Sequence, residues 1–271
     1  MSGDVDAQRL ELLDAVQAGV ASGNTWLFSL NKSGTTFLCH VLAFYYARLL
    51  SRSDITFDTI RSVGILRWSR DMDVETYIAS AIAFRSSTSL PLVVVTPHNI
   101  RASYRTAVLL TRNPFDYCVS SYHYRYVRRR HQNQVSLDEA IPDIIAKWVA
   151  TEIDQTRLLE ADPEHVKRVR YEDLVTEPER EIAGILRFMG VEGSEADLRI
   201  AIAEAGKDRL REHEIQTGRA AVAGDSFTAP HFVRSGKIGE WRGVLSPAQV
   251  RVIEDQLERC GIPSSRYDQD A

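Results

Sequence analysis

A polar segment near the start of the chain, Lys32-Ser-Gly-Thr-Thr36, has the composition of an anion-binding site. Lys32 supplies a positive charge, Gly34 lets a ligand come close to the backbone, and the three hydroxyl groups can donate hydrogen bonds. The flanking residues indicate how the fold positions this segment. Trp26–Leu30 is a short apolar run typical of a buried strand, and Thr35–Leu50 is an apolar segment without Gly or Pro that predicts a helix.

A strand that turns sharply into a helix leaves backbone N–H groups unpaired at the helix N-terminus, and the aligned peptide dipoles add positive charge there. The segment therefore predicts a phosphate cradle. It is not a Walker A loop, in which Lys follows the second Gly, because Lys32 precedes Gly34. An ordinary strand-to-helix turn with a solvated Lys would have the same sequence, so other motifs must decide between the two interpretations.

A second candidate anion site follows another apolar run, Thr106–Thr111, which predicts a buried strand. The next residues are Arg112-Asn-Pro-Phe-Asp-Tyr-Cys-Val-Ser120, in which Asn113 suits a helix cap and Pro114 suits the first turn. Arg112 would then project from the strand end, and Ser120 would lie further along the helix. A guanidinium group from one side and a hydroxyl group from the other can close on one phosphate.

A histidine follows a third apolar run. Leu92–Val95 is rich in valine and flanked by prolines, as in a strand buried on both faces, and His98 comes just after it. Ligands of open parallel sheets bind outside the carboxyl ends of the strands. A lone His is often a structural or surface residue, but this position makes His98 a candidate general base.

Taken together, these motifs resemble the sulfotransferases that use 3′-phosphoadenosine 5′-phosphosulfate (PAPS). Lys-Ser-Gly-Thr-Thr followed by an aromatic residue resembles their 5′-phosphosulfate loop, and Arg-x-Pro-x-Asp-x-x-x-Ser resembles their 3′-phosphate motif. Tyr171-Glu-Asp-Leu174 and the stretch from Arg234 to Trp241 resemble two further segments of the family. The resemblance runs through residues 25–260 in family order.

The resemblance implies that a sulfuryl group passes from PAPS, the co-substrate, to a hydroxyl or amine of an acceptor, without a metal ion. Positioning and charge stabilisation would carry most of the catalysis. His98 is expected to act as general base, and Lys32 to stabilise charge on the leaving phosphate. The residues expected to bind the cofactor are Lys32, Ser33, Gly34, Thr35, Thr36, Phe37, Arg112, Ser120, Tyr171, Arg234, Ser235 and Gly236.

The chain also departs from the family pattern. Thr96 and Pro97 precede His98 where Lys-Thr is common, so a second catalytic Lys is absent, and Lys207 lies where the family often has an aromatic residue. Ser235 replaces a Lys of the C-terminal motif. The dimerisation pattern near residues 242–251 is degenerate, so no oligomeric state is predicted.

The alternation of short apolar runs with longer helical segments predicts an α/β protein with a central, mostly parallel sheet and helices on both faces. One sulfotransferase domain over residues 1–271 is expected, with an N-terminal helix within residues 1–23 and a mobile cofactor or acceptor loop over residues 215–240. Residues 51–72 show no clear pattern, and Arg61–Arg70 within them is interpreted as a surface connection, with part of an acceptor-binding loop as the alternative. The other expected elements are helices over 74–84, 135–159, 192–214 and 247–260, and a strand-like stretch over 165–174.

The composition limits the partners of the protein. The 271 residues carry a net charge of −4, which argues against a nucleic-acid or membrane-surface binder. The interleaved aromatic and Arg residues of 122–131 could bind single-stranded nucleic acid, but the acidic balance favours a helix whose basic face lies near the cofactor. The three cysteines are far apart, so neither a disulfide framework nor a zinc motif is indicated. No long apolar segment or signal peptide is recognised, so a cytoplasmic location is expected.

Two other functions stay open at this point. A P-loop nucleotide kinase-like phosphotransferase would need a differently placed Lys and an acidic residue at a strand end to hold Mg²⁺. A non-catalytic nucleotide-binding relative would keep the fold without the chemistry. The acceptor is expected to be a small molecule.

Overall fold

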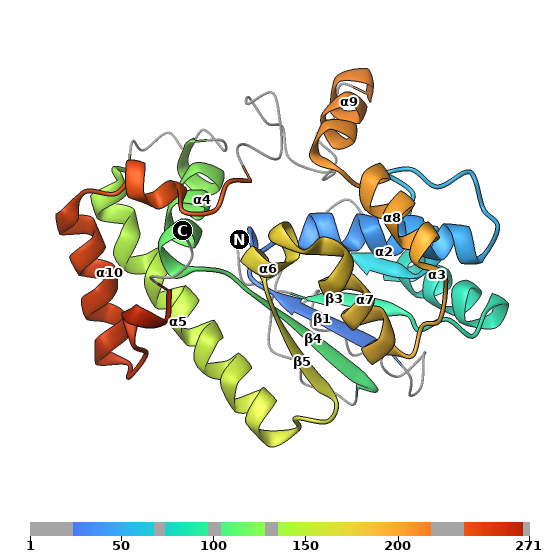
Figure 1. The fold of residues 1–271 in the computed structure, drawn as a ribbon, viewed down its shortest axis with the longest axis horizontal. Helices are drawn as coiled ribbons and strands as arrows, with labels where there is room; N and C mark the ends of the chain where they lie inside the picture. Colours follow the sequence, from blue (N-terminus) through green and yellow to red (C-terminus); the bar gives the residue numbers. More distant parts are fainter. Residues whose placement is uncertain (1–23, 68–73, 97–103, 128–134, 218–235, 268–271) are drawn as a thin grey trace.

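The computed structural model describes residues 24–67, 74–96, 104–127, 135–217 and 236–267. At its centre is a five-stranded parallel sheet in the order β2-β3-β1-β4-β5 (Figure 1). The prediction of an α/β fold around a parallel sheet is confirmed. The strands are β1 (Thr25–Ser29), β2 (Ile65–Arg67), β3 (Val93–Thr96), β4 (Thr106–Thr111) and β5 (Val166–Arg170).

Helices connect and cover these strands. The helix expected over Thr35–Leu50 forms as α2 and ends at Leu49, and the helix expected after β4 begins at Pro114 and becomes π-helical at His123. The α-helices are α2 (Thr35–Leu49), α3 (Val74–Ser87), α4 (Pro114–Tyr122), α5 (Leu137–Ala161), α6 (Tyr171–Thr176), α7 (Pro178–Met189), α8 (Glu195–Glu204), α9 (Lys207–Thr217) and α10 (Pro247–Arg259). Three short 3₁₀ segments are η1 (Ile60–Val63), η3 (Glu240–Gly243) and η4 (Ser264–Tyr267), and η2 (His123–Val127) is π-helical.

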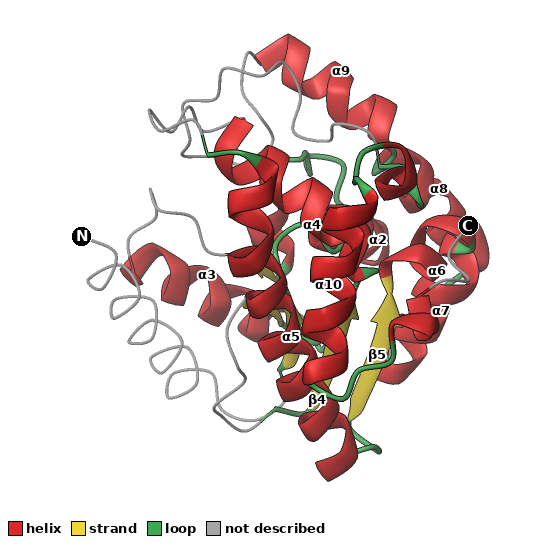
Figure 2. Cartoon of the chain, turned by 90° about the vertical axis from the view of Figure 1, so that its left-hand side faces the viewer, coloured by secondary structure: helices red, strands yellow, loops and turns green. Residues whose placement is uncertain are grey.

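The helices form layers on the two sides of the sheet. Figure 2 shows α7 and α8 on one side and α3 and α5 on the other. On the first side α8 packs against both α2 and α7, and on the second α10 packs against α5 and α4. The central strands are covered on both faces, and Trp26 of β1 and Leu109 of β4 are completely buried. A separate apolar cluster joins α4, α5 and α10 around Trp148.

Several sequence-based expectations need correction. Residues 65–67 are not a surface connection but the edge strand β2, in which Ile65 and Leu66 are fully buried against β3. The strand-like stretch over 165–174 ends at Arg170, and α6 begins at Tyr171. The helical stretch predicted over 192–214 forms two separate helices, because the helix is interrupted between Glu204 and Lys207. The expected N-terminal helix lies outside the described residues.

The five strands of the described residues run in one direction, so their carboxyl ends meet at one edge of the sheet. Lys32 lies in the turn after β1, Arg112 follows β4, and Tyr171 follows β5. Arg67 is the last residue of β2. The fold therefore gathers the predicted anion sites where parallel sheets bind their ligands.

Candidate functional site

The cradle has an unusual backbone. Lys32 has φ 79 and Gly34 has φ 88, so two residues of one short turn are left-handed. Lys32 carries a Cβ, and holding such a residue there costs about 1–3 kcal/mol, a strain that concentrates at functional sites. At position 34 a Cβ would lie 2.9 Å from Cδ2 of Tyr171, so only glycine fits. The turn brings the backbone close to Tyr171 and opens it toward a ligand.

Gly34 is the N-cap of α2, and no side chain among the described residues caps this helix. The N–H groups of the first turn therefore lack intrahelical partners and face the cradle. Two hydroxyl groups join them. Thr35 bonds with Ser29 at 2.5 Å between the hydroxyl oxygens, and Thr36 Oγ1 accepts a hydrogen bond of 3.0 Å from Nη1 of Arg67. The arrangement offers backbone and hydroxyl donors to one anion.

Arg112 connects the cradle to the end of β5. Its Nη1 donates to the carbonyl oxygen of Lys32 at 2.9 Å, and its Cζ lies 4.2 Å from the ring centre of Tyr171. The side chain is 6% exposed, and its buried Nε has no hydrogen-bond partner among the described residues. A buried charged donor without an acceptor is costly, so this position fits a group that donates to an anionic ligand.

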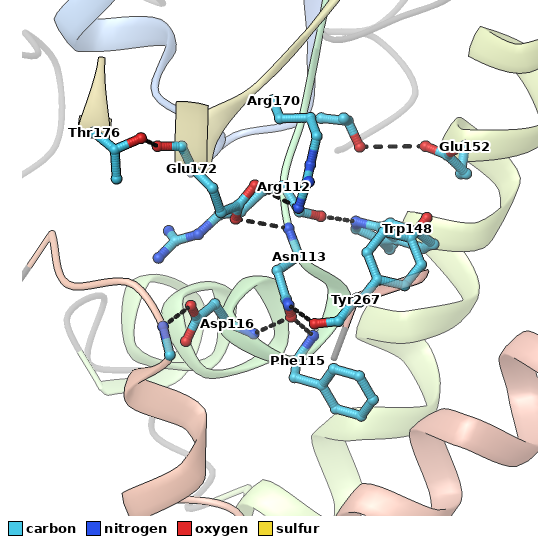
Figure 3. Close-up of polar contacts among 12 residues, drawn as sticks. Arg112, Asn113, Phe115, Asp116, Trp148, Glu152, Arg170, Glu172, Thr176 and Tyr267 are labelled. Atoms are coloured by element: carbon cyan, nitrogen blue, oxygen red, sulfur yellow. Dashed lines mark hydrogen bonds and ion pairs between the residues drawn. The ribbon is translucent and has the colours of Figure 1, made fainter. Parts of the chain in front are cut away.

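The backbone that carries Arg112 is fixed from several sides (Figure 3). Asn113 caps α4, as predicted: its Oδ1 accepts from the N–H groups of Phe115 and Asp116, at 3.0 and 3.4 Å. Its Nδ2 donates to the Tyr267 carbonyl at 3.0 Å, and its N–H donates to Glu172 at 2.9 Å. The indole of Trp148 donates to the Arg112 carbonyl at 2.9 Å. Arg112 thus projects from a rigid turn.

Asp116 ties the C-terminal segment to this turn, a role that the sequence did not predict. The buried Asp116 carboxylate accepts from the N–H of Gly239 at 2.7 Å and from the N–H of Trp241 at 3.0 Å. The Trp241 ring stacks on Phe115, with centroids 4.6 Å apart. The sequence signal for this role was the Asp of the Arg-x-Pro-x-Asp motif. Its partners, the backbone N–H groups of Gly239 and Trp241, lie too far away in sequence to be predicted.

Tyr171 completes the connection. Its hydroxyl donates to the carbonyl of Gly236 at 3.1 Å. Burial raises the pKa of this hydroxyl, and the nearby Arg112 lowers it by a smaller amount, so Tyr171 stays protonated and remains a donor. The predicted site residues Lys32, Arg112 and Gly236 are therefore in contact with one another or with Tyr171.

A tyrosine from the π-helical segment η2 also reaches the cradle. The ammonium nitrogen of Lys32 lies 5.2 Å from the ring centroid of Tyr124. Single turns of π-helix occur often at functional sites. Cations within about 6 Å of an aromatic face are attracted by the ring. Tyr124 therefore helps to place the Lys32 ammonium group.

Some of the remaining predicted site residues lie within the described ranges, and others do not. Ser33 is buried in the turn, and Ser120 is partly exposed on α4. Phe37 is partly buried and packs against the main core. His98, Arg234 and Ser235 lie outside the described residues. In the described ranges no cluster of three or more His, Cys, Asp or Glu side chains could hold a metal ion, and no helix there has the length and apolarity to cross a membrane.

The family model described as the sulfotransferase domain matches residues 22–260. Cytosolic sulfotransferase 15 of Arabidopsis thaliana is 26% identical over 172 residues, which cover 57% of this chain and 47% of that protein. Sulfotransferase 1A1 of Bos taurus is 26% identical over 178 residues, covering 62% and 58%. The matches thus span about half the length of these curated relatives.

Solved structures share the fold. Mouse sulfotransferase SULT7A1 complexed with PAP has a TM-score of 0.66 at 16% identity, covering 93% of this chain and 89% of that one. Retinol dehydratase in complex with androsterone and the inactive cofactor PAP has a TM-score of 0.63 at 15% identity, covering 92% and 84%. With the family model matching most of the sequence, the chain belongs to the sulfotransferase domain family.

Proposed function

We propose that this protein is a PAPS-dependent sulfotransferase that acts on a hydroxyl or amine of a small-molecule acceptor. The observation that carries the proposal is the link through Arg112. This side chain bonds to the backbone of the cradle on one side and stacks over Tyr171 on the other. Two anion-binding positions therefore lie next to each other, which suits a ligand with a 5′-phosphosulfate and a 3′-phosphate.

The residues fit such a ligand. The uncapped N-terminus of α2, with the hydroxyl groups of Thr35 and Thr36, would hold the 5′ end. Arg112 has a buried Nε without a partner in the described ranges, and with Ser120 it would hold the 3′-phosphate. Gly236 accepts a hydrogen bond from the Tyr171 hydroxyl beside the site, and Arg234 and Ser235 are proposed to contribute to binding of the 3′-phosphate as well.

Bound PAPS supplies the sulfuryl group: the acceptor atom bonds to sulfur as the bond to the 5′-phosphate oxygen breaks, and the electron pair leaves with that phosphate. Lys32 would neutralise the negative charge that develops there. His98 would take the proton of the acceptor. The backbone donors of α2 are fixed before the reaction, so they need no reorganisation as the charge develops.

We also propose a cytoplasmic location and no nucleic-acid or membrane partner. The net charge of −4 argues against both partners, and all three cysteines are free thiols. Burial raises the pKa of the Cys39 thiol to about 11, and it also raises the pKa of Cys118, so both stay protonated and unreactive.

Thermal unfolding with 3′-phosphoadenosine 5′-phosphate (PAP), ATP–Mg²⁺ or AMP tests the proposal. A ligand that binds only the folded state, at a hundredfold over its Kd, adds about 2.7 kcal/mol and raises the melting temperature. We expect the shift with PAP, and we expect Arg112→Ala to abolish it. Arg48→Ala, at the far end of α2, is the matched control and should keep it. Turnover is then read as sulfated product from PAPS and a panel of small alcohols, phenols and amines.

A shift with ATP–Mg²⁺ but not with PAP would contradict the proposal in favour of a kinase-like enzyme. No shift with any nucleotide would contradict it as well. Binding of PAP without sulfated product from any acceptor class would favour a relative that binds the nucleotide but lacks the chemistry.

A further inference from the structure

A cation outside the motifs that resemble the family lies beside the cradle. Arg67 ends the edge strand β2, is partly buried, and donates from Nη1 to Thr36 Oγ1 at 3.0 Å. We propose that Arg67 is a further cofactor-binding residue: it orients the Thr36 hydroxyl and brings a second side-chain charge to the 5′ end of the bound nucleotide. The proposal rests on the proposed function, because it concerns the same ligand.

The hydrogen bond fixes the direction in which Thr36 can donate. A hydroxyl group has one proton, and Oγ1 already accepts from Arg67. Arginine is always protonated, so this contact never reverses. The Thr36 proton is therefore left for another acceptor. Thr36 lies in the first turn of α2, where the uncapped backbone N–H groups lie, so an anion in the cradle is placed to accept it.

The charge of Arg67 is not cancelled by the α2 residues that face it. Cys39 and His40 are both buried and lie within electrostatic range of Arg67. Burial, helped by Arg67, lowers the pKa of His40 to about 3, so the imidazole is neutral near pH 7, and Cys39 is a neutral thiol. No carboxylate of the described residues forms an ion pair with Arg67. Its positive charge is thus available to an anion in the cradle.

The strand end that carries Arg67 is itself held in place. Arg61 of η1 donates from Nε to the Arg67 carbonyl at 3.2 Å, and Ile65 and Leu66 are buried beside β3. The Arg67 backbone is therefore rigid, and its guanidinium has further N–H donors in a fixed fork. These donors can reach an oxygen of the 5′ group that Thr36 also contacts.

The test compares two nucleotides in the purified full chain. Isothermal titration gives the Kd of PAP, which has a 5′-phosphate, and ligand-observed NMR gives the affinity of adenosine 3′-phosphate, which lacks it. We expect Arg67→Met to weaken the binding of PAP about ten- to hundredfold, as for the loss of a hydrogen bond to a charged group. Binding of adenosine 3′-phosphate should be unchanged. A general disturbance of the fold would weaken both ligands.

Three further variants sharpen the result. Arg67→Lys should weaken PAP less than Arg67→Met does, because it keeps the charge and loses the fork. Thr36→Val should weaken the binding of PAP. Adding Arg67→Met to Thr36→Val should weaken PAP binding by a smaller factor than Arg67→Met does in the wild type, because the two residues act on the same group. Arg48→Met, at the opposite end of α2, should bind PAP like the wild type.

The outcomes separate the two proposals. Wild-type protein that does not bind PAP would overturn the proposed function and this inference together. Wild-type protein that binds PAP, with Arg67→Met and Arg67→Lys binding it equally well, would overturn the inference and leave the function standing. An equal loss for both nucleotides in Arg67→Met and Arg67→Lys would assign Arg67 a structural role and overturn the inference.

Discussion

Arg112 and Lys32 are joined by a hydrogen bond from Nη1 to a backbone carbonyl at 2.9 Å, although β4 and the cradle lie far apart in sequence. Lys32 has a positive φ, which is strained for a residue with a Cβ, so this bond stabilises the left-handed conformation of Lys32. The same guanidinium stacks over Tyr171. One side chain therefore couples the shape of the cradle to the second anion-binding position.

Arg112→Lys should weaken the binding of PAP about tenfold or more, although the variant keeps the positive charge. A lysine has no planar fork, so it cannot bond to the Lys32 carbonyl and stack over Tyr171 while it contacts a phosphate. Calorimetric titration of PAP measures the loss, with Arg48→Lys as the control. Unchanged affinity in Arg112→Lys would show that a point charge is enough and that the coupling has no role in binding.

Gly34→Ala should destabilise the fold by about 1–3 kcal/mol, because φ 88 is strained for alanine and the new Cβ would meet the Tyr171 ring at 2.9 Å. Urea unfolding measures the change. Gly243→Ala is the matched control, since nothing lies within 4 Å of a Cβ built there. Equal stability of the two variants would mean that the turn relaxes at little cost.

Asp116→Ala should release the C-terminal segment from α4. Two backbone N–H groups, of Gly239 and Trp241, would lose their acceptor, at a cost of about 1–3 kcal/mol each where they stay buried. The Trp241 ring would leave Phe115, so tryptophan fluorescence should shift to the red, and PAP affinity should fall. Asp255→Ala, on the exposed side of α10, is the control. Native fluorescence and affinity in Asp116→Ala would contradict this role.

The strands that the sequence predicted well are those with a continuous apolar run. Thr106–Thr111 was predicted at its observed bounds, because both faces of β4 are covered and every residue before Thr111 is buried. β2 was missed, because it has only three residues, of which Arg67 is one, and it lies in a stretch whose arginines and apolar residues follow no clear period. At an edge strand so short, pairing with β3 decides the structure, and this pairing is not visible in local sequence.

In the candidate site, too, features set by local sequence were predicted, and features set by contacts between distant elements were not. The cap formed by Asn113, the first-turn Pro114 and the left-handed Gly34 are features of single turns, so local residue preferences were enough to predict them. Asp116 and Arg67 act through partners on other elements, Trp241 and Thr36. No spacing rule connects such pairs, and the fold alone brings them together.

His40 should make stability fall in mild acid. Its pKa is about 3 in the folded chain, mainly through burial, and about 6.5 when unfolded, so below pH 6.5 the unfolded state binds more protons. The contribution of the neutral imidazole is full above pH 6.5 and is lost as pH falls toward 3. Between pH 7 and pH 5 the wild type should lose about 2 kcal/mol more than His40→Gln. Urea unfolding at both values checks this, with the exposed His165→Gln as control, and parallel losses in wild type and His40→Gln would contradict it.

Tyr124 should act on turnover through its ring, because the Lys32 ammonium lies 5.2 Å from the ring centroid. Tyr124→Phe keeps the ring face and should retain kcat within about twofold, whereas Tyr124→Leu loses an attraction of about 0.5–2 kcal/mol and should lower kcat several-fold. PAP affinity should change little in Tyr124→Leu if the ring places the ammonium for the transfer step. Steady-state kinetics with PAPS and any acceptor found in the screen separates the two parameters, and Tyr126→Leu on the same segment is the control. A loss in Tyr124→Phe equal to that in Tyr124→Leu would assign the effect to the hydroxyl and contradict the role of the ring.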